Sequence, residues 1–99
     1  MLILSGTIRI AVGQHAAAVP VIARMLEASR AESGCVRYTF AFDVLDEHLL
    51  HIFEVWSDEA ALAAHRASPH MATWRAAAAG LGVHDRQLVQ YEVSGSHTA

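Results

Sequence analysis

The sequence predicts an α+β fold in which one four-stranded antiparallel sheet carries its helices on one face. Segments with alternating apolar and polar residues, typical of strands, are interleaved with segments of helical apolar spacing. Two of the predicted strands follow each other across a short polar turn, which indicates a hairpin. The chain has 99 residues, the length of one domain. We expect residues 1–99 to form a single domain with its core over residues 2–93.

The first strand and the first helix occupy residues 2–32. Residues 2–12 begin with apolar side chains on both faces, as expected of a strand covered on both sides, and Gly13 ends them. Pro20 lies within the helical segment that follows. Because proline in a helix interior costs about 3 kcal/mol, we expect the helix to begin near Ala17. The apolar stripe of this helix comprises Val19, Ile22, Met25 and Leu26.

A β-hairpin is predicted next. Gly34 is placed to end the helix, and residues 36–42 then alternate between apolar and more polar side chains. Residues 43–47 supply a polar turn, and residues 49–56 form the return strand. The face that carries the aromatic side chains contains Val36, Tyr38, Phe40 and Phe42.

Two short helices and a last strand complete the prediction. Ser57 or Asp58 is placed to cap a helix over residues 59–67, and Pro69 suits the first turn of a second helix. The remaining boundaries are the helix-closing Gly80 and Gly82, a strand over residues 84–93 and a frayed tail over residues 94–99. This element order is the ferredoxin-like arrangement, which leaves one face of the sheet without helices.

Composition bears on the partners of the chain. Apolar residues make up 54% of the sequence and charged residues only 17%, so we expect another copy to cover part of the apolar surface in a homodimer. The net charge of −3 lacks the basic excess of nucleic-acid-binding proteins. No apolar run reaches the roughly 20 residues of a membrane span, and the N-terminus lacks signal-peptide features. We therefore expect a cytoplasmic protein without nucleic-acid or membrane partners.

Four candidate site residues follow one another from the return strand into the helices. Glu54 and Trp56 lie two residues apart and share a strand face. Glu54 could orient His65 or an arginine, or form an ion pair at a subunit interface. His65 could act as a general base or be a surface or capping residue, and His70 could cover a pocket or bond a free backbone group. The five-residue spacing of the histidines does not place two metal ligands on one helical face, so no metal site is expected.

Aromatic and sulfur-containing side chains could line a substrate pocket or fill a core. Trp56 is large and flat enough to stack on an aromatic substrate, although a tryptophan in a strand is often a core residue. The other candidates for an apolar pocket wall are Tyr38, Phe40, Phe42, Met71 and Trp74. The single cysteine, Cys35, excludes an internal disulfide and a cysteine-bound cluster, and we expect it to be buried.

Two motifs resemble the antibiotic biosynthesis monooxygenase family, in particular its small quinol-monooxygenase-like members. The first is the run Glu54-Val-Trp56 followed by His65 and Ser68-Pro69-His70-Met71; the second is the turn Glu32-Ser-Gly34-Cys35-Val-Arg-Tyr38. The resemblance implies a dimeric α/β barrel in which two sheets face each other. It also implies cofactor-independent oxidation of a hydroquinone or polycyclic phenol by dioxygen, with His65 as the base and the aromatic residues as the cradle. The sequence contains no glycine-rich phosphate loop for a redox cofactor.

Other readings remain open. Heme-degrading proteins of the same superfamily carry an asparagine on the first strand, where this chain has Gly6, and a histidine near Trp74 or Arg75, so heme degradation is disfavoured. An autoinducer-type isomerase would act on a phosphorylated ketone without oxygen, with Arg37, Arg66 or Arg75 as phosphate contacts. A non-catalytic dimeric module that binds a hydrophobic metabolite is the third class. Only a monooxygenase would consume dioxygen.

Overall fold

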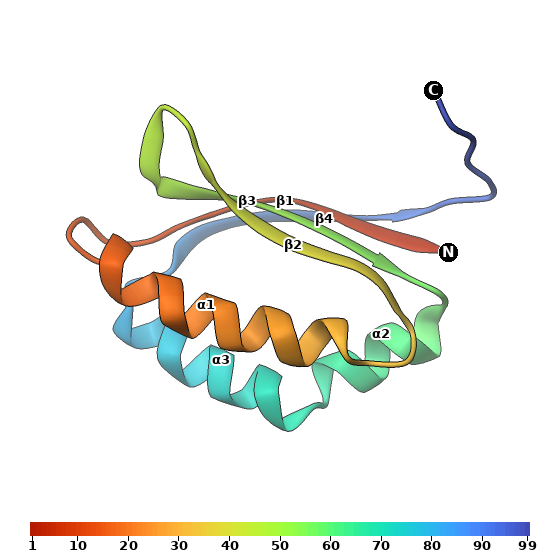
Figure 1. Ribbon diagram of the computed structural model, residues 1–99, viewed down its shortest axis with the longest axis horizontal. Helices are drawn as coiled ribbons and strands as arrows, with labels where there is room; N and C mark the ends of the chain where they lie inside the picture. Colours follow the sequence, from red (N-terminus) through yellow and green to blue (C-terminus); the bar gives the residue numbers. More distant parts are fainter.

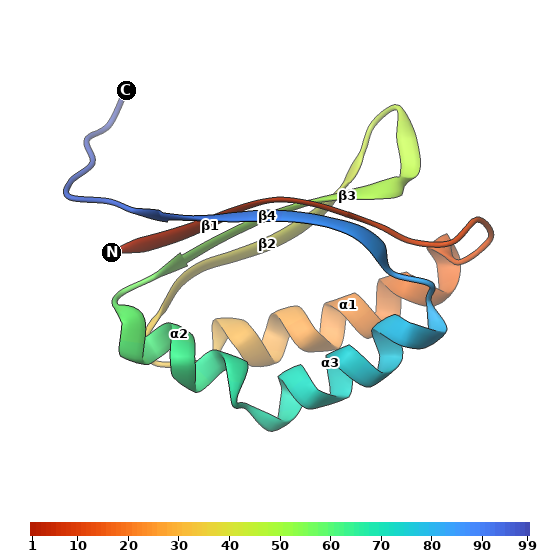
Figure 2. The ribbon, with the colours of Figure 1, turned by 180° about the vertical axis from the view of Figure 1, so that it is seen from behind.

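The computed structural model describes all residues 1–99, and it confirms the predicted α+β class. Four antiparallel strands form one sheet in the order β2-β3-β1-β4, which is the ferredoxin-like topology. Figures 1 and 2 show that all three helices lie against the same face of this sheet. The elements are β1 (Leu2–Arg9), α1 (His15–Arg30), β2 (Cys35–Asp43), β3 (Asp46–Trp56), α2 (Glu59–Arg66), α3 (Pro69–Gly80) and β4 (His84–Glu92).

Helix α1 begins earlier than the sequence predicted. It starts at His15 and contains Pro20, so the expected start near Ala17 is wrong. The missing amide of Pro20 leaves the carbonyl of Ala16 without its helical partner, but both residues are exposed, where water can hydrate that carbonyl. The buried stripe also differs from the prediction, because Val19 is exposed. The stripe consists of Ala18, Ile22, Met25 and Ser29.

Gly34 does not end α1, because the helix ends at Arg30 with Ala31 as its C-cap. The φ angle of Gly34 is not positive, and the residue serves a different purpose. A Cβ atom at this position would lie 2.2 Å from the Cβ of Ala61 on α2. Glycine is therefore needed for the close approach of the turn before β2 to helix α2.

The predicted helix caps around α2 and α3 are largely confirmed. The Asp58 carboxylate accepts a hydrogen bond from the Ala61 amide at the start of α2. Ser68 caps α3, and Pro69 occupies its first turn. Two helices therefore meet at a sharp break between Arg66 and Pro69, and this break fixes where His65 and His70 lie relative to each other.

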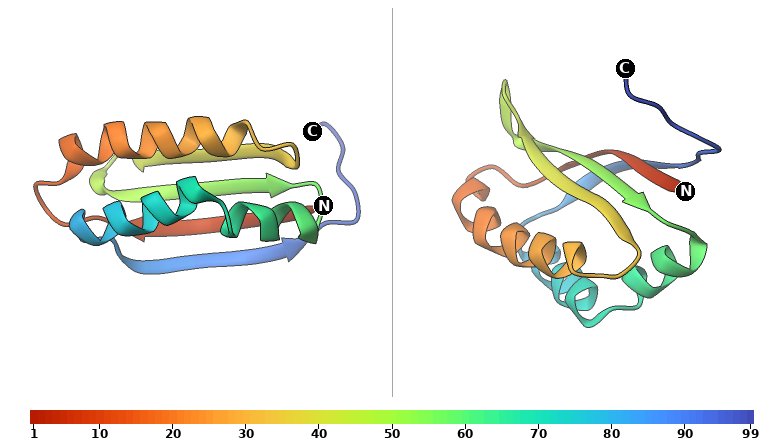
Figure 3. Two further views of the ribbon diagram at one scale, coloured as in Figure 1. Left: turned by 90° about the horizontal axis from the view of Figure 1, so that it is seen from below. Right: turned by 45° about the vertical axis from the view of Figure 1, so that its right-hand side comes forward.

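The core lies between the sheet and the helices. Leu50, Ile52 and Trp56 of β3 face the helices together with Tyr38 of β2. Figure 3 (left) shows α1 running beside α3, while β4 lies at one edge of the sheet, outside the area that the helices cover. Strand β4 is accordingly exposed along most of its length.

The opposite face of the sheet carries no helix (Figures 1 and 2). The strand registers place Ile3, Phe53 and Val55 near its centre, with Val89 and Tyr91 on β4. The last two are 52% and 51% exposed. We call the helix-free side of the sheet that these five residues mark the open face. It provides the apolar surface that the composition led us to expect, and the homodimer stays a prediction.

Candidate functional site

A cavity of about 730 Å³ lies between the sheet and helix α3. Its volume falls in the range typical of sites for small organic ligands. Every strand of the sheet contributes to its wall, and apolar side chains dominate. The lining residues are Ile8, Tyr38, Phe40, Ile52, Glu54, Arg66, Met71, Trp74, Arg75, Ala78, Ala79, Val83, Arg86 and Leu88.

Five of the predicted site residues line this cavity, and four do not. Those in the wall are Glu54, Tyr38, Phe40, Met71 and Trp74. Trp56 and His65 are buried next to it, and His70 lines a separate small pocket between α1 and α3. Phe42 packs against His15, 4.2 Å away between ring centroids, and does not reach the cavity.

The aromatic wall is built by alternation on β2 and by one residue of α3. Tyr38 and Phe40 stack with their ring centroids 5.6 Å apart. Trp74 meets Phe40 edge-on, at 5.8 Å and 88°. These distances are typical of favourable aromatic pairs, so the wall is held in a defined shape before any ligand binds.

Glu54 is the only acidic residue in the cavity wall. Its side chain lies on the helix-covered face of the sheet, and the residue is 5% exposed. The Nε1 group of Trp56 donates a hydrogen bond of 3.0 Å to Glu54 Oε1. Burial raises the pKa of Glu54, and this effect exceeds the lowering by Trp56, His65 and nearby arginines. A buried carboxyl group in a cavity wall whose pKa is raised in this way is typical of functional sites.

His65 lies behind the cavity wall, against two aromatic rings. Its ring centroid is 4.4 Å from that of Trp56 and 5.1 Å from that of Tyr38. Its side chain is only 3% exposed, and Nδ1 lies 2.6 Å from Oε2 of Glu32. Because a carboxylate only accepts hydrogen bonds, Nδ1 is the donor in this contact. Every fully buried polar side-chain atom has a hydrogen-bond partner. Because Nε2 of His65 has no partner within the chain, this atom is not completely buried.

Glu32 joins His65 to His70. The same Oε2 atom that accepts from His65 lies 2.9 Å from Nε2 of His70. The Ser68 hydroxyl is 3.2 Å from that nitrogen and donates to the carbonyl of His65. We call Glu32, His65 and His70 the Glu–His–His cluster.

Glu32 was not among the site residues predicted from the sequence. Its signal was present in the turn motif that also contains Gly34 and Cys35, but that motif contributed only to the family resemblance and gave Glu32 no role in the site. Glu32 is separated from its two partners by 33 and 38 residues, and no local spacing rule connects such positions.

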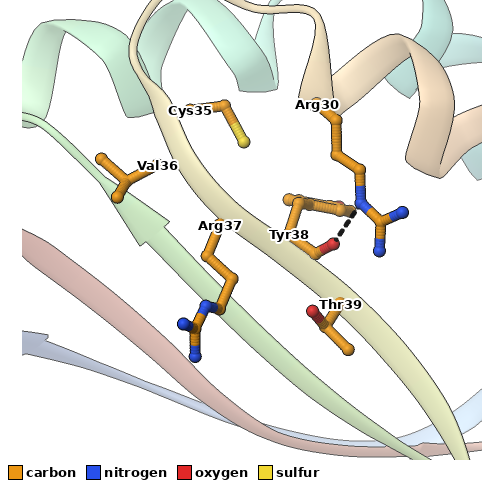
Figure 4. Close-up of a pocket in the computed structure, with 6 residues that line it drawn as sticks. All are labelled: Arg30, Cys35, Val36, Arg37, Tyr38 and Thr39. Atoms are coloured by element: carbon orange, nitrogen blue, oxygen red, sulfur yellow. Dashed lines mark hydrogen bonds between the residues drawn. The ribbon is translucent and has the colours of Figure 1, made fainter.

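A second, smaller pocket of about 220 Å³ lies at the outer edge of β2 (Figure 4). Arg30 Nε donates a hydrogen bond of 2.8 Å to the carbonyl of Tyr38 and so occupies part of the free strand edge. Cys35, which also lines this pocket, is partly exposed and not buried as predicted. Partial burial and the charge of Glu32 raise the pKa of the thiol, which argues against a reactive thiolate.

Three comparisons place this geometry among known proteins. The family model described as antibiotic biosynthesis monooxygenase matches residues 1–77. The crystal structure of a proposed antibiotic biosynthesis monooxygenase from Deinococcus radiodurans superposes with a TM-score of 0.90 at 25% identity, covering 100% of this chain and 98% of the other. The protein PA3566 of Pseudomonas aeruginosa superposes with a TM-score of 0.83 at 31% identity, covering 94% of each chain.

A curated relative from Synechocystis sp., described as uncharacterized, is 29% identical over 69 residues. The match includes 70% of this chain and 47% of the relative, so this chain matches about half the length of that protein. None of the helices in the structure has the length and apolar character that a membrane span requires.

Proposed function

Because the chain belongs to the antibiotic biosynthesis monooxygenase family, we propose that it oxidises a hydroquinone or a polycyclic phenol with dioxygen in the cavity beneath the sheet. The substrate supplies all the electrons. In the hydroquinone case, one oxygen atom enters the ring to give a hydroxyquinone, and the other leaves as water. The chain then needs to bind the ring, remove a phenolic proton and exclude bulk water.

The observation that carries this proposal is the aromatic wall with one buried carboxyl group. Tyr38, Phe40 and Trp74 offer ring faces and edges to a flat substrate. Glu54 stands in the same wall with Oε1 already bonded to Trp56. Its second oxygen is free to bind a substrate hydroxyl, which would orient the ring.

His65 is the proposed base, and because its ring packs behind Tyr38 and Trp56 and not in the cavity wall, the substrate hydroxyl has to reach Nε2 between these rings or through one bridging water. Glu32 Oε2 lies 2.6 Å from His65 Nδ1 and accepts its proton in a hydrogen bond, which favours the tautomer that leaves Nε2 as the proton acceptor. When Nε2 takes the phenolic proton, the positive imidazolium that forms is stabilised by the adjacent carboxylate. General bases of this kind contribute about 10²–10⁴-fold to a rate. Trp56 and Tyr38 pack on the ring and keep it in place.

The homodimer is the second part of the proposal. A single chain leaves the open face uncovered, with Val89 and Tyr91 half exposed. The guanidinium of Arg37 lies 5.8 Å from the ring centroid of Phe53 on this face, so apolar and cationic groups are available for a second sheet. Glu54 lies on the other face, and the interface ion pair considered from sequence is therefore not part of the proposal.

Oxygen uptake tests the reaction. The purified protein is supplied with a panel of hydroquinones and polycyclic phenols, with autoxidation subtracted, and compared with His65→Ala and Glu32→Gln. We expect uptake above background, a loss of about 10²-fold or more in His65→Ala and unchanged uptake in the control His84→Ala, an exposed histidine at the start of β4. Absence of uptake across the panel contradicts the oxygenase. Equal uptake in His65→Ala contradicts the base.

Three arginines give an isomerase a specific point in its favour. Arg66, Arg75 and Arg86 line the cavity and could bind a phosphate group, whereas Arg37 lies on the open face. Such an enzyme would convert a phosphorylated ketone without consuming oxygen. A binding module without turnover is distinguished by ligand affinity that survives in His65→Ala while no product forms in either protein.

A further inference from the structure

We propose that Glu32, His65 and His70 form a binding site for one divalent transition-metal ion of the zinc type. The site lies at the junction of the turn before β2, the end of α2 and the start of α3. One carboxylate and two imidazoles are a common ligand set for zinc, which leaves a fourth position open for water.

The positions of the ligand atoms carry this proposal. His65 Nδ1, His70 Nε2 and a Glu32 carboxylate oxygen all lie within 4.8 Å of one another. Zinc binds nitrogen and oxygen ligands at about 2.0–2.2 Å, so neighbouring ligands of one tetrahedral ion are roughly 3.3–3.5 Å apart. The present separations from Glu32 Oε2 are 2.6 Å and 2.9 Å. Replacing the two bridging protons with an ion therefore requires Glu32 Oε2 to move away from each of the two nitrogens by less than about 1 Å, and the two nitrogens already lie within 4.8 Å of each other.

The break between the helices explains why this site escapes a sequence search. On one continuous helix, ligands five residues apart point in different directions. Here His65 is in the last turn of α2 and His70 in the first turn of α3. Ser68 fixes the geometry of the break by accepting a bond from the Met71 amide and donating one to the His65 carbonyl. Glu32 then closes the site from a third segment.

The cluster is also accessible. The His65 side chain is 3% exposed, whereas the side chains of Glu32 and His70 are 18% and 22% exposed. An ion can therefore enter past Glu32 and His70 and complete its coordination against a buried imidazole. Two neutral histidines with one carboxylate reduce the charge of a divalent ion by one, and water at the open position keeps the rest solvated.

Metal binding would oppose the proposed catalysis, a consequence that rests on the proposed function. An ion on Nδ1 of His65 displaces the proton from that nitrogen, and the neutral ring then carries its proton on Nε2. That nitrogen can no longer accept a proton from a substrate. Zinc is thus expected to inhibit the oxygenase, with the metal site and the base sharing one imidazole.

Metal titration of the full chain tests the site without any substrate. The protein is first treated with a chelator, and the chelator is then removed. Zn²⁺ binding is measured by calorimetric titration, and Co²⁺ binding is followed by the visible absorption of the bound ion. We expect one ion per chain, and affinity at least about 10-fold weaker in Glu32→Gln and in His70→Ala. Circular dichroism confirms that these variants are folded, and His84→Ala serves as the control because it removes an exposed histidine outside the cluster.

The outcomes separate the site from the function. Binding of one ion that is weakened in both cluster variants and unchanged in His84→Ala supports the site, whether or not the protein consumes oxygen. No stoichiometric binding, or binding that is unchanged in Glu32→Gln and His70→Ala, overturns it. If the protein is an active oxygenase and binds the ion at the cluster without losing activity, the base assigned to Nε2 of His65 is wrong while the site stands.

Discussion

Replacing Gly34 with alanine should destabilise the protein by pushing the turn before β2 away from α2. The new Cβ would lie 2.2 Å from the Cβ of Ala61, 3.1 Å from Ser57 Oγ and 3.3 Å from Ala61 Cα. Carbon atoms pack at about 3.5–4.0 Å, so the two Cβ atoms must separate by more than 1 Å. The Gly34 carbonyl also accepts a hydrogen bond of 2.9 Å from the Ser57 amide, which that movement would stretch.

The expected cost of this substitution follows from overpacking. Forcing extra atoms into a packed site typically costs about 1–3 kcal/mol, and a clash that involves a backbone turn belongs at the upper end, near 3 kcal/mol. One kcal/mol shifts the Tm of a domain of this size by about 4–8 °C, so the Tm should fall by roughly 12–24 °C. Ala61→Gly alone should cost about 1 kcal/mol, the helix penalty of glycine.

The pair of substitutions tests the reasoning. Urea denaturation and thermal melts are measured for Gly34→Ala, for Ala61→Gly and for both together. Because Ala61→Gly removes the atom that Gly34→Ala would strike, the double variant should be more stable than Gly34→Ala alone, with a coupling free energy of about 2 kcal/mol or more. Additive losses would refute the steric explanation, and so would a Gly34→Ala variant as stable as the parent.

Three further predictions concern charge and assembly. Burial raises the folded-state pKa of Glu54, so its contribution to stability is fully present below the unfolded pKa and is lost as pH rises through the folded pKa. Glu54→Gln should therefore gain stability relative to the parent as pH rises above the unfolded-state pKa of glutamate, measured by urea titrations at a series of pH values. A stability difference that does not change with pH would contradict this. The pKa of Asp43 is lowered chiefly by its hydrogen bond from His51. The stabilisation that ionised Asp43 provides is therefore present above its unfolded-state pKa and is lost as pH falls through its folded-state pKa. Asp43→Asn should flatten the acid limb of the curve of stability against pH, and an unchanged acid limb would speak against the pairing of Asp43 with His51. Val89→Asp should convert the proposed dimer to monomers, measured by light scattering. The stability of the single chain should change little, because Val89 is exposed there. A parent protein that is monomeric, or a variant that is still dimeric, would show that the open face is not the dimer interface.

The parts of the fold and site that depend on short-range patterns could be predicted from sequence. Alternation placed Tyr38 and Phe40 on one face of β2, and the structure confirms this. The two-residue spacing of Glu54 and Trp56 predicted that they share one face of the strand, and the structure confirms this, with the two side chains hydrogen-bonded on the helix-covered face. Period and local capping chemistry are encoded within a few residues, so the sequence alone contains them.

The errors arose where tertiary packing overrides a local preference. Pro20 disfavours a helix interior, but its exposed position lets α1 run through it. Gly34 resembles a helix-ending glycine, but its role depends on Ala61, which lies on a different element. Whether Trp56 lines the cavity or lies behind it depends on how far α2 and α3 stand from the sheet, which no pattern in the sequence records.

The arrangement of the candidate site depends on Trp56, where local and long-range interactions meet. Its Nε1 group donates to Glu54, two residues away on the same strand. Its ring packs on His65, which Glu32 in turn holds from a distant turn. A buried carboxyl facing the cavity and a buried imidazole behind the wall are thus tied to one rigid indole, which has no exposed surface. Trp56 satisfies one oxygen of Glu54, while Glu32 satisfies Nδ1 of His65. The relative position of the proposed base and the proposed substrate-orienting group is thus a property of the folded core, already set before a ligand enters.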